Sequence, residues 1–207
     1  MVCNQCYTLK ISDKLFLKQK NVNLRILTLL LLLTVVSCQQ NTPRDKDISI
    51  LKDKADSIAT LSQNVLLQNV AGAIQKGGTE YAVDFCQVEA IPITDSLSKE
   101  VQMYIQRITD KNRNPQNNLK TKNDRTIFGE FKRKSKLFDT LLIEEKQYVY
   151  YKRINLAMPT CLKCHGNPQT DIEDKTLQKI NTFYPNDKAV GYKLNDFRGL
   201  WKIDIPK

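Results

Sequence analysis

The sequence predicts an α+β domain in which helices come first and an antiparallel sheet follows. Apolar residues recur at helical spacing over residues 47–76, directly after a short polar stretch. Later segments show the two-residue alternation and the aromatic and β-branched content of strands. The chain has no internal repeat and no regular alternation of strand and helix patterns, so we expect antiparallel pairing rather than βαβ units.

The helical part is expected to contain two helices. The first covers residues 47–76 and is ended by Gly77 and Gly78, because glycine readily leaves the helical conformation. A second helix is expected over residues 79–90. It should end before Pro92, because the residue that precedes a proline disfavours helical backbone.

Strands and two shorter helices make up the rest of the predicted domain. The aromatic and β-branched segments 137–143 and 147–156 are separated by a tight turn, which predicts a hairpin. The other elements are a strand at residues 101–106, a polar loop at 110–123, helices at 124–136 and 175–183, and a last strand at 200–205.

The N-terminus has the pattern of an export signal. Residues 26–36 form an apolar run that follows basic residues and is shorter than the roughly 20 residues of a membrane span. The run ends at Ser37-Cys38, and a cysteine after a small residue at this point resembles a bacterial lipobox. We therefore expect residues 1–37 to be a lipoprotein signal peptide and Cys38 to be lipidated, with an ordinary signal peptide as the alternative.

This signal predicts the domain plan and the compartment. A polar tether over residues 38–46 leads into one domain, residues 47–207, which a lipid holds in the cell envelope on the periplasmic side. Outside the cytoplasm, free thiols tend to be oxidised or occupied. The mature chain keeps Cys86, Cys161 and Cys164. Since three thiols are one too many for a single disulfide, a bound group that uses them is the better explanation.

Composition and charge exclude several classes of protein. The chain has 207 residues, 32 Lys and Arg, 22 Asp and Glu and one His, which gives a formal net charge of +10. Without residues 1–37 the count is 27 against 21, so the mature chain carries only +6 and its charge does not indicate nucleic acid. The single histidine excludes any site that needs two histidines from one chain.

The motif with the clearest chemistry is Cys161-Leu162-Lys163-Cys164-His165, a Cys-x-x-Cys-His sequence typical of covalent haem c attachment. Two thiols three residues apart are spaced to reach the two vinyl groups of one porphyrin, and the adjacent imidazole then binds the iron. We therefore expect one haem c, with thioethers to Cys161 and Cys164 and with His165 as an axial ligand.

Other uses of the two thiols have less support. A thioredoxin-like redox pair needs a βαβ unit around it, and no such pattern surrounds residues 161–164. A zinc site needs a fourth ligand. It would also have to use the neighbouring Cys164 and His165 together, which is awkward for one tetrahedral ion. A chance match involves only three fixed residues, but the export signal suits haem c, which is matured outside the cytoplasm.

The second axial ligand is open at this level. It cannot be a histidine of this chain, so the alternatives are Met103, Met158, Cys86, a lysine, water or an empty position. Met158 lies only seven residues before His165 and is poorly placed to reach the opposite face. Met103 and Cys86 each have a simpler explanation, because methionine and free cysteine are often buried as ordinary core residues.

Four segments in order along the chain carry a family resemblance. They are Ala82-Val83-Asp84-Phe85-Cys86 with Glu89-Ala90, Arg107 with Arg113-Asn114-Pro115 and Asn117, Cys161 to Gly166 with Pro168, and Tyr184-Pro185-Asn186-Asp187 to Tyr192 with Asp196 and Arg198-Gly199. Together they resemble a family of periplasmic c-type haem proteins with a PAS-like fold, which includes cyanobacterial haem proteins and sensor ectodomains. The resemblance covers about residues 61–206. The chain departs from the pattern at two positions. Ile91 separates Ala90 from Pro92 where the pattern has Ala-Pro, and Asn195 stands where glycine is usual.

The resemblance implies a PAS-like α+β fold around one haem, with His165 and Cys86 as the two axial ligands. It leaves the roles of Arg107 and Arg113 open. Both are suited to pair with haem propionates, because a guanidinium binds a carboxylate through two parallel hydrogen bonds, and both are equally explained as solvated loop charges.

These observations favour a lipid-anchored haem c protein for one-electron transfer or redox sensing. A haem with two axial ligands has no open position for substrate, so a carrier or sensor is expected rather than an enzyme. One alternative is a diatomic-gas or redox sensor in which Cys86 leaves the iron and a separate partner is signalled. Another is a metal-binding or structural lipoprotein without haem. The expected partners are the membrane, through Cys38, and a redox protein, but not nucleic acid.

Overall fold

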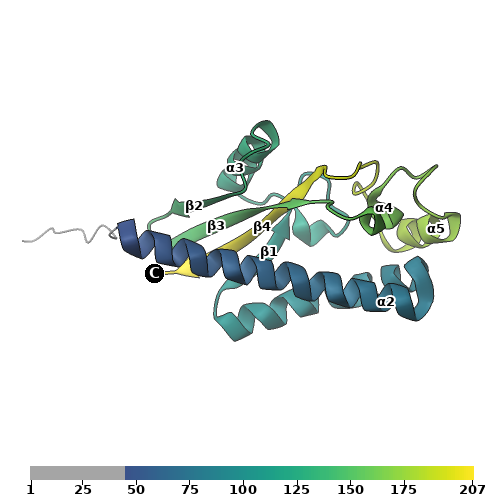
Figure 1. Cartoon of the computed structure of the whole chain (residues 1–207), viewed down its shortest axis with the longest axis horizontal. Coiled ribbons are helices and arrows are strands. Elements are labelled where there is room, and N and C mark those ends of the chain that lie inside the picture. The colour runs from purple at the N-terminus through teal and green to yellow at the C-terminus, as the bar shows by residue number, and fades with distance from the viewer. Residues whose placement is uncertain (1–44) are drawn as a thin grey trace, which may run out of the picture. The chain divides into compact units, whose positions relative to one another are not determined.

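A computed structural model of the chain describes residues 45–207 (Figure 1). The predicted signal peptide, Cys38 and all but the end of the tether lie outside the described residues. In chain order the elements are α2 (Asp45–Val101), β1 (Tyr104–Ile108), η2 (Pro115–Asn117), α3 (Lys122–Arg133), β2 (Asp139–Ile143), β3 (Gln147–Asn155), α4 (Pro159–His165), α5 (Asp174–Phe183) and β4 (Phe197–Pro206). None of these helices carries an apolar stretch long enough to cross a bilayer.

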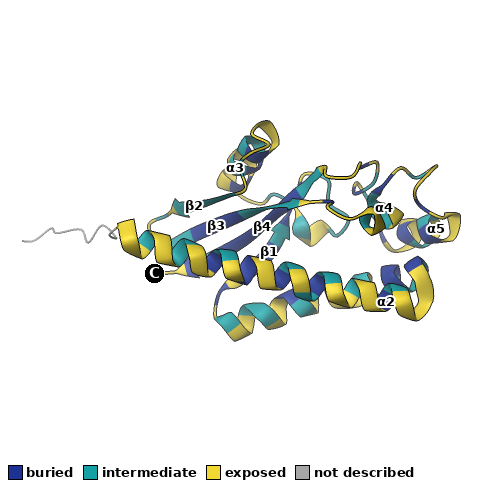
Figure 2. Ribbon diagram, viewed as in Figure 1, coloured by how far each residue is buried: buried dark blue, intermediate teal, exposed yellow. Residues whose placement is uncertain are grey.

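The strands form one antiparallel sheet in the order β1-β4-β3-β2, so the predicted α+β class is confirmed. The hairpin of β2 and β3 forms where the sequence predicts it. The longest pairing joins β3 to β4, from Gln147 opposite Pro206 to Asn155 opposite Phe197, with an irregularity at Ile154 and Asn155. The middle residues of these two central strands are buried (Figure 2).

The predicted break in the long helix is present. Gly77 and Gly78 leave the helical conformation, and Gly78 has a φ of 72°, which favours glycine over any residue with a Cβ. The break divides α2 into a first arm, residues 45–76, and a second arm, residues 79–101. The chain reverses there, and the second arm returns beside the first (Figure 1).

The predicted end of the second helix at Pro92 is wrong, because the helix continues to Val101 with Pro92 inside it. A proline in a helix costs one backbone hydrogen bond but does not forbid the turns that follow. Those turns are held by burial, since Ala90, Leu97 and Val101 belong to or pack against the core under the sheet. Packing of this apolar face therefore outweighs the local preference at Pro92.

The strand predicted at residues 101–106 is shifted toward the C-terminus, because Val101 still belongs to the helix and β1 begins at Tyr104. Gln102 turns the chain with a φ of 55°. The Met103 N–H donates to the Ser98 carbonyl at 3.1 Å, and the Ser98 hydroxyl accepts from the Ile105 N–H at 2.9 Å. Met103 is buried in the core, which agrees with its interpretation as an ordinary core methionine.

The two faces of the sheet are covered by different helices. Both arms of α2 cover one face, where a core forms around Ile105, Tyr150, Trp201 and Ile203. Helix α3 covers the other, where Phe128 and Phe131 pack against residues that include Ile108, Val149, Tyr151 and Leu200. The domain is therefore a helix–sheet–helix arrangement of three layers.

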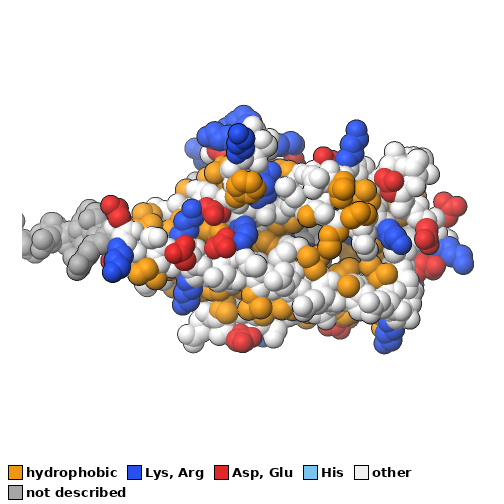
Figure 3. All heavy atoms as spheres, in the orientation of Figure 1, with side chains coloured by type: hydrophobic (Ala, Val, Ile, Leu, Met, Phe, Trp, Pro, Cys, Tyr) orange, Lys and Arg blue, Asp and Glu red, His pale blue; other side chains and the backbone are white. Residues whose placement is uncertain are grey.

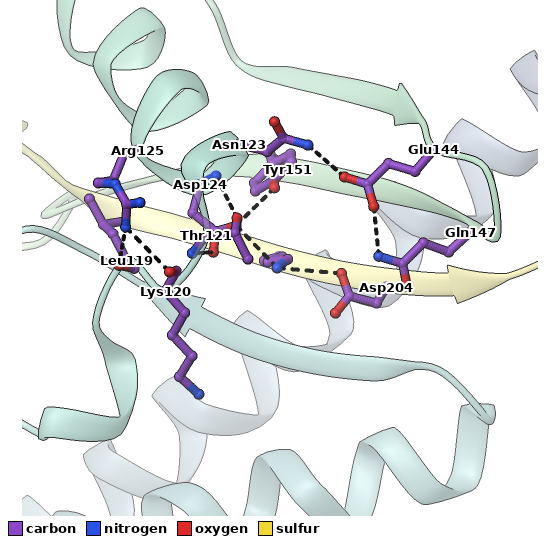
Figure 4. A network of polar contacts seen from close by, with 11 residues as sticks. Leu119, Lys120, Thr121, Asn123, Asp124, Arg125, Glu144, Gln147, Tyr151 and Asp204 are labelled. Carbon is purple, nitrogen blue, oxygen red and sulfur yellow. Dashed lines mark hydrogen bonds and ion pairs between the residues drawn. The ribbon is translucent and has the colours of Figure 1, made fainter.

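A polar network is buried under α3 (Figure 4). Asp124 accepts from the Thr121 N–H at 2.9 Å and from the Tyr151 hydroxyl at 2.9 Å, and it lies 3.1 Å from the Lys202 ammonium. The Thr121 hydroxyl accepts in return from the Asp124 N–H at 2.9 Å, which completes a capping box. One carboxylate thus caps α3 and neutralises a buried lysine of β4. The cap also starts α3 two residues earlier than the sequence predicted.

Candidate functional site

A cavity of about 320 Å³ lies between α2 and one end of the sheet. It is lined by both arms of α2, β1, the segment after β3, α4 and the start of β4. The first arm contributes an apolar wall, which consists of Leu66, Leu67, Val70, Ala71 and Ile74. Figure 3 shows apolar side chains gathered around this hollow. Its size and its apolar lining with few polar groups are typical of a site for a small molecule or cofactor.

Helix α4 places the Cys-x-x-Cys-His motif on the cavity wall. The helix begins at Pro159, whose fixed φ suits the first helical position. It ends at Gly166, where a Cβ would lie 2.6 Å from the Asp171 side chain. Within this short helix Cys161, Cys164 and His165 all line the cavity, and both cysteines are free thiols. Burial raises the pKa of Cys164 to about 11, so this thiol is protonated at neutral pH.

The orientation of the His165 ring is fixed by the backbone. Its Nδ1 lies 2.7 Å from the Ala189 carbonyl oxygen. Because a carbonyl only accepts, Nδ1 carries the proton and the neutral ring has its lone pair on Nε2. Burial lowers the pKa of His165 well below its ordinary value, and Arg113 and Arg198 lower it further. The ring is therefore neutral, in the tautomer that metal-binding histidines use.

Cys86 reaches the same cavity from a different element. It lies on the second arm of α2, where Ala82, Val83 and Ala90 also line the cavity. Helix α5 braces this arm through a buried 2.6 Å hydrogen bond between the hydroxyls of Thr79 and Thr176. Burial raises the pKa of the Cys86 thiol, although Arg107 and Arg113 act in the opposite direction.

Three arginines line the cavity, and their partners differ. Arg113 donates to the Cys164 carbonyl at 2.6 Å and forms a 3.0 Å ion pair with Asp187. Arg198 donates to the Lys111 carbonyl at 3.0 Å. The buried Nε of Arg107, in contrast, has no hydrogen-bond partner among residues 45–207. Burial lowers the pKa of Arg107, which reflects how poorly its charge is solvated there.

A family model matches residues 34–206, which is most of the chain, and its description is Tll0287-like. The chain belongs to the Tll0287-like family. The fold agrees with this assignment, because the structure is similar to the crystal structure of the cyanobacterial haem protein Tll0287 with a TM-score of 0.56. The two sequences are 22% identical, over 75% of this chain and 96% of that chain. No curated protein matches the chain. The predicted PAS-like family and fold are thus confirmed.

The structure of this Tll0287-like chain brings most of the predicted site residues together. Cys86, Cys161, Cys164 and His165 share the cavity, and Met158 also lines it. Met103 does not, because it lies in the core between α2 and the sheet. Cys38 lies outside the described residues.

The alternatives for the two thiols of α4 differ in their fit to the described residues. The sheet of this Tll0287-like domain is antiparallel throughout, so the βαβ setting of a thioredoxin-like pair does not occur among them. Within residues 45–207 no three His, Cys, Asp or Glu side chains are grouped to hold a bare metal ion.

Some residues of the site were not assigned a role from the sequence. Asp187 binds Arg113, and the Ala189 carbonyl binds His165. Both residues lie in the C-terminal motif that carried the family resemblance, so the sequence indicated that this segment matters but not which contacts it makes. Gly199 is confined by contact, since a Cβ there would lie 2.7 Å from the Ile108 carbonyl oxygen. Asn195 has a φ of 69°, which explains why glycine suits this position and why asparagine replaces it.

Proposed function

We propose that this chain is a lipid-anchored periplasmic haem c protein for one-electron transfer or redox sensing. Cys161 and Cys164 hold the haem through thioethers, and His165 and Cys86 are its axial ligands. The observation that carries the proposal is that one apolar cavity is lined at once by the complete Cys-x-x-Cys-His motif and by the remaining thiol of the described residues. The similarity to the cyanobacterial haem protein Tll0287 supports it.

The donor set of the cavity fits this cofactor. The Nε2 lone pair of His165 is free for iron, because Nδ1 is bound to the Ala189 carbonyl. The apolar wall of the first arm suits a porphyrin, and the unpartnered Nε of Arg107 suits a propionate. Arg113 is less suited to a propionate, because Asp187 and the Cys164 carbonyl already occupy it. Bound here, haem supplies a one-electron couple, and a thiolate ligand favours its ferric state.

The motif and Cys86 have different parts in this proposal. The residues of α4 keep the cofactor permanently, since thioethers do not dissociate. Cys86 comes from α2, so its bond can break while attachment through α4 persists. This separation supports the second candidate function, in which a diatomic gas or a change of redox state displaces Cys86 and a partner reads the change.

The first experiment tests covalent attachment. The purified protein should show a haem c absorption spectrum and keep haem staining on a denaturing gel. Replacing both Cys161 and Cys164 by Ala should abolish the stain, because no thioether forms. The control is Cys86→Ala, which should keep it. Staining of the double variant, or a colourless wild-type protein, contradicts the proposal and favours a lipoprotein without haem.

The second experiment tests the anchor. Cys38→Ser should release the protein from membranes or block its processing, because the lipid is carried by this thiol. Cell fractionation and the mass of the mature protein are the measurements, with Cys86→Ser as the control that keeps the signal region intact. An unchanged fraction and mass for Cys38→Ser contradict lipidation at this residue.

A further inference from the structure

The positive charge of the described domain is concentrated on one segment. Residues 45–207 contain 26 Lys and Arg and 21 Asp and Glu, a net charge of +5. The segment 120–138, which contains α3, has seven basic residues and two acidic ones, so it carries the whole excess. The rest of the domain is neutral. We name this segment the basic surface; its seven basic residues are Lys120, Lys122, Arg125, Lys132, Arg133, Lys134 and Lys136.

All seven basic side chains are exposed, and Figure 3 shows Lys and Arg side chains gathered over α3. Three of these basic residues are paired at the surface, Arg133 and Lys134 with Glu130 and Lys132 with Asp110, while Asp124 is turned inward to Lys202. Lys120, Lys122, Arg125 and Lys136 form no ion pair within residues 45–207. Phe138 lies at the end of the basic surface with 65% of its area exposed. Basic side chains beside an exposed aromatic ring are typical of surfaces that bind anionic membranes.

The position of the basic surface also favours a membrane over a redox partner. It covers the sheet face opposite α2, and Figure 1 places it toward the same end of the domain as the first turn of α2 and away from α4 and α5. The cavity is lined by α2 and α4, whereas α3 packs on the other face of the sheet, so the sheet would separate a redox protein docked on α3 from the cavity. If Cys38 carries a lipid, the seven residues to Asp45 reach at most about 25 Å and keep this end of the domain close to the bilayer.

We infer that the basic surface binds anionic lipid headgroups and orients the domain so that the cavity faces away from the membrane. The inference rests on the lipid anchor of the proposed function for its location in the cell. The binding itself depends only on α3 and its flanks, so it is measurable without the lipid.

The experiment uses the chain from residue 38 on with Cys38→Ser, since residues 45–207 form a compact unit with their own cores. It should sediment with vesicles that contain 30% phosphatidylglycerol but not with pure phosphatidylcholine, at roughly 0.1 M salt. The triple variant K122Q/K134Q/K136Q should bind more than tenfold more weakly, because it removes three of the positive charges that attract the basic surface to anionic headgroups.

The matched control K54Q/K146Q/K175Q removes the same charge from exposed positions elsewhere and should bind like the parent chain. An equal loss in both triple variants, or no binding to anionic vesicles, overturns the inference. Retention on a polyglutamate resin without vesicle binding would instead assign the basic surface to an acidic protein and also overturns it. A failure of Cys38 lipidation is distinguishable, because it appears only in the cell fractionation.

A second inference concerns the loop that holds His165. One oxygen of Asp187 accepts from Arg113, and the other accepts from the Ala189 N–H at 2.8 Å. The carbonyl of the same Ala189 accepts from His165, while Arg113 binds the carbonyl of Cys164. The Asp187 and Arg113 side chains are only 5% and 13% exposed. The contacts form a closed circuit from α4 through the loop and back to the ring.

We propose that Asp187 and Arg113 are positioning residues that set the orientation of the His165 ring toward the cofactor. This rests on the proposed function, because it assumes that His165 binds iron. The His165 backbone is fixed separately by the Tyr192 N–H, which donates to its carbonyl at 3.0 Å. Loss of the circuit should therefore free the ring without releasing α4.

The test compares Asp187→Asn with Asp187→Glu and with Asp110→Asn, which removes the carboxylate of an exposed pair with Lys132. Asp187→Asn should keep haem staining but shift and broaden the ferric paramagnetic resonance signal, and Asp187→Glu should restore it partly. Asp110→Asn should leave the signal unchanged. An unaltered signal in Asp187→Asn overturns the positioning role, whereas an absence of haem from the wild-type protein overturns the proposed function instead.

Discussion

Two buried charged groups of the molecule differ in how they are neutralised. Under α3, the Lys202 ammonium lies 3.1 Å from Asp124, whose carboxylate also accepts from Tyr151 and Thr121. In the cavity, the buried Nε of Arg107 has no hydrogen-bond partner within residues 45–207, and the guanidinium lies 5.8 Å from the centre of the Trp201 ring. A buried cation that lacks an anion is costly. The comparison teaches that the charge of Lys202 is neutralised within the fold, while the charge of Arg107 has no anionic partner among the described residues.

The largest expected effect comes from breaking the pair of Asp124 and Lys202. Asp124→Asn should lower the free energy of unfolding by about 3–5 kcal/mol, because it leaves the buried Lys202 with only the more distant carboxylate of Asp204, at 3.7 Å. The measurement is urea unfolding at pH 7. Glu130→Gln on the same helix removes a carboxylate from an exposed pair and should change stability little. An equal effect of the two variants contradicts the assignment of Asp124 as a structural centre.

The same pair predicts a dependence on pH. Burial alone raises the pKa of Asp124, but hydrogen bonds from Thr121 and Lys202 outweigh it and hold the pKa below its ordinary value of 3.8. A carboxyl with a lowered folded pKa contributes its stability above the unfolded pKa and loses it as the pH falls through the folded pKa. The charged and titratable groups that face Asp124 are Lys202 and Asp204 of β4 and Tyr151 of β3. They are the same in the wild type and in Asp124→Asn.

The stability gap between wild type and Asp124→Asn should therefore be full at pH 7 and narrow below about pH 4. Unfolding curves of both proteins at pH 7, 5 and 3 measure this gap. A gap that stays constant down to pH 3 means that the carboxylate charge of Asp124 is not what stabilises the fold.

Replacing Arg107 should stabilise the haem-free protein, whereas Asp124→Asn should destabilise the fold. In the haem-free protein, Arg107→Met should raise the free energy of unfolding by about 1–3 kcal/mol, because it removes a charge whose buried Nε has no hydrogen-bond partner among the described residues and leaves an apolar side chain beside Trp201. In the haem-loaded protein the gain should vanish or reverse, since a propionate loses its partner. Thermal unfolding of both forms tests this. Destabilisation of the haem-free variant shows that Arg107 is satisfied by the protein itself.

The smallest effect on stability and the clearest effect on spectrum are expected at Cys86. Cys86→Ala should change the stability of the haem-free protein by about 1 kcal/mol or less. Its loaded form should show a high-spin or water-bound ferric spectrum and a higher reduction potential, because a thiolate is lost. Met103→Leu and Met158→Leu should leave the ferric spectrum nearly intact. An unchanged ferric spectrum in Cys86→Ala means that another group is the second ligand.

Sequence reasoning reached the features that local chemistry determines. The break at Gly77 and Gly78 and the hairpin of β2 and β3 both follow from residues close together in the chain. It misplaced the end of α2, because the burial of Ala90, Leu97 and Val101 is a property of the assembled core and not of the segment around Pro92.

The supporting contacts of the site were beyond the sequence for the same reason. Arg113 and Asp187 are 74 residues apart, and His165 and Ala189 are 24 apart, so only the fold brings each pair together. The sequence marked Arg107 and Arg113 as equivalent candidates. The structure separates them, because one is already paired and the other is not.

The first arm of α2 also constrains how the length of related chains can change. Ala55 and Ala59 pack in the core under the sheet, while Leu66 and Val70 line the cavity. One residue inserted between the two pairs would turn the cavity pair by about 100° and carry it off the wall. Seven residues would restore its direction to within about 20° but move it about 10 Å along the axis. Length differences among relatives should therefore collect outside this arm, in segments such as the loop before α3.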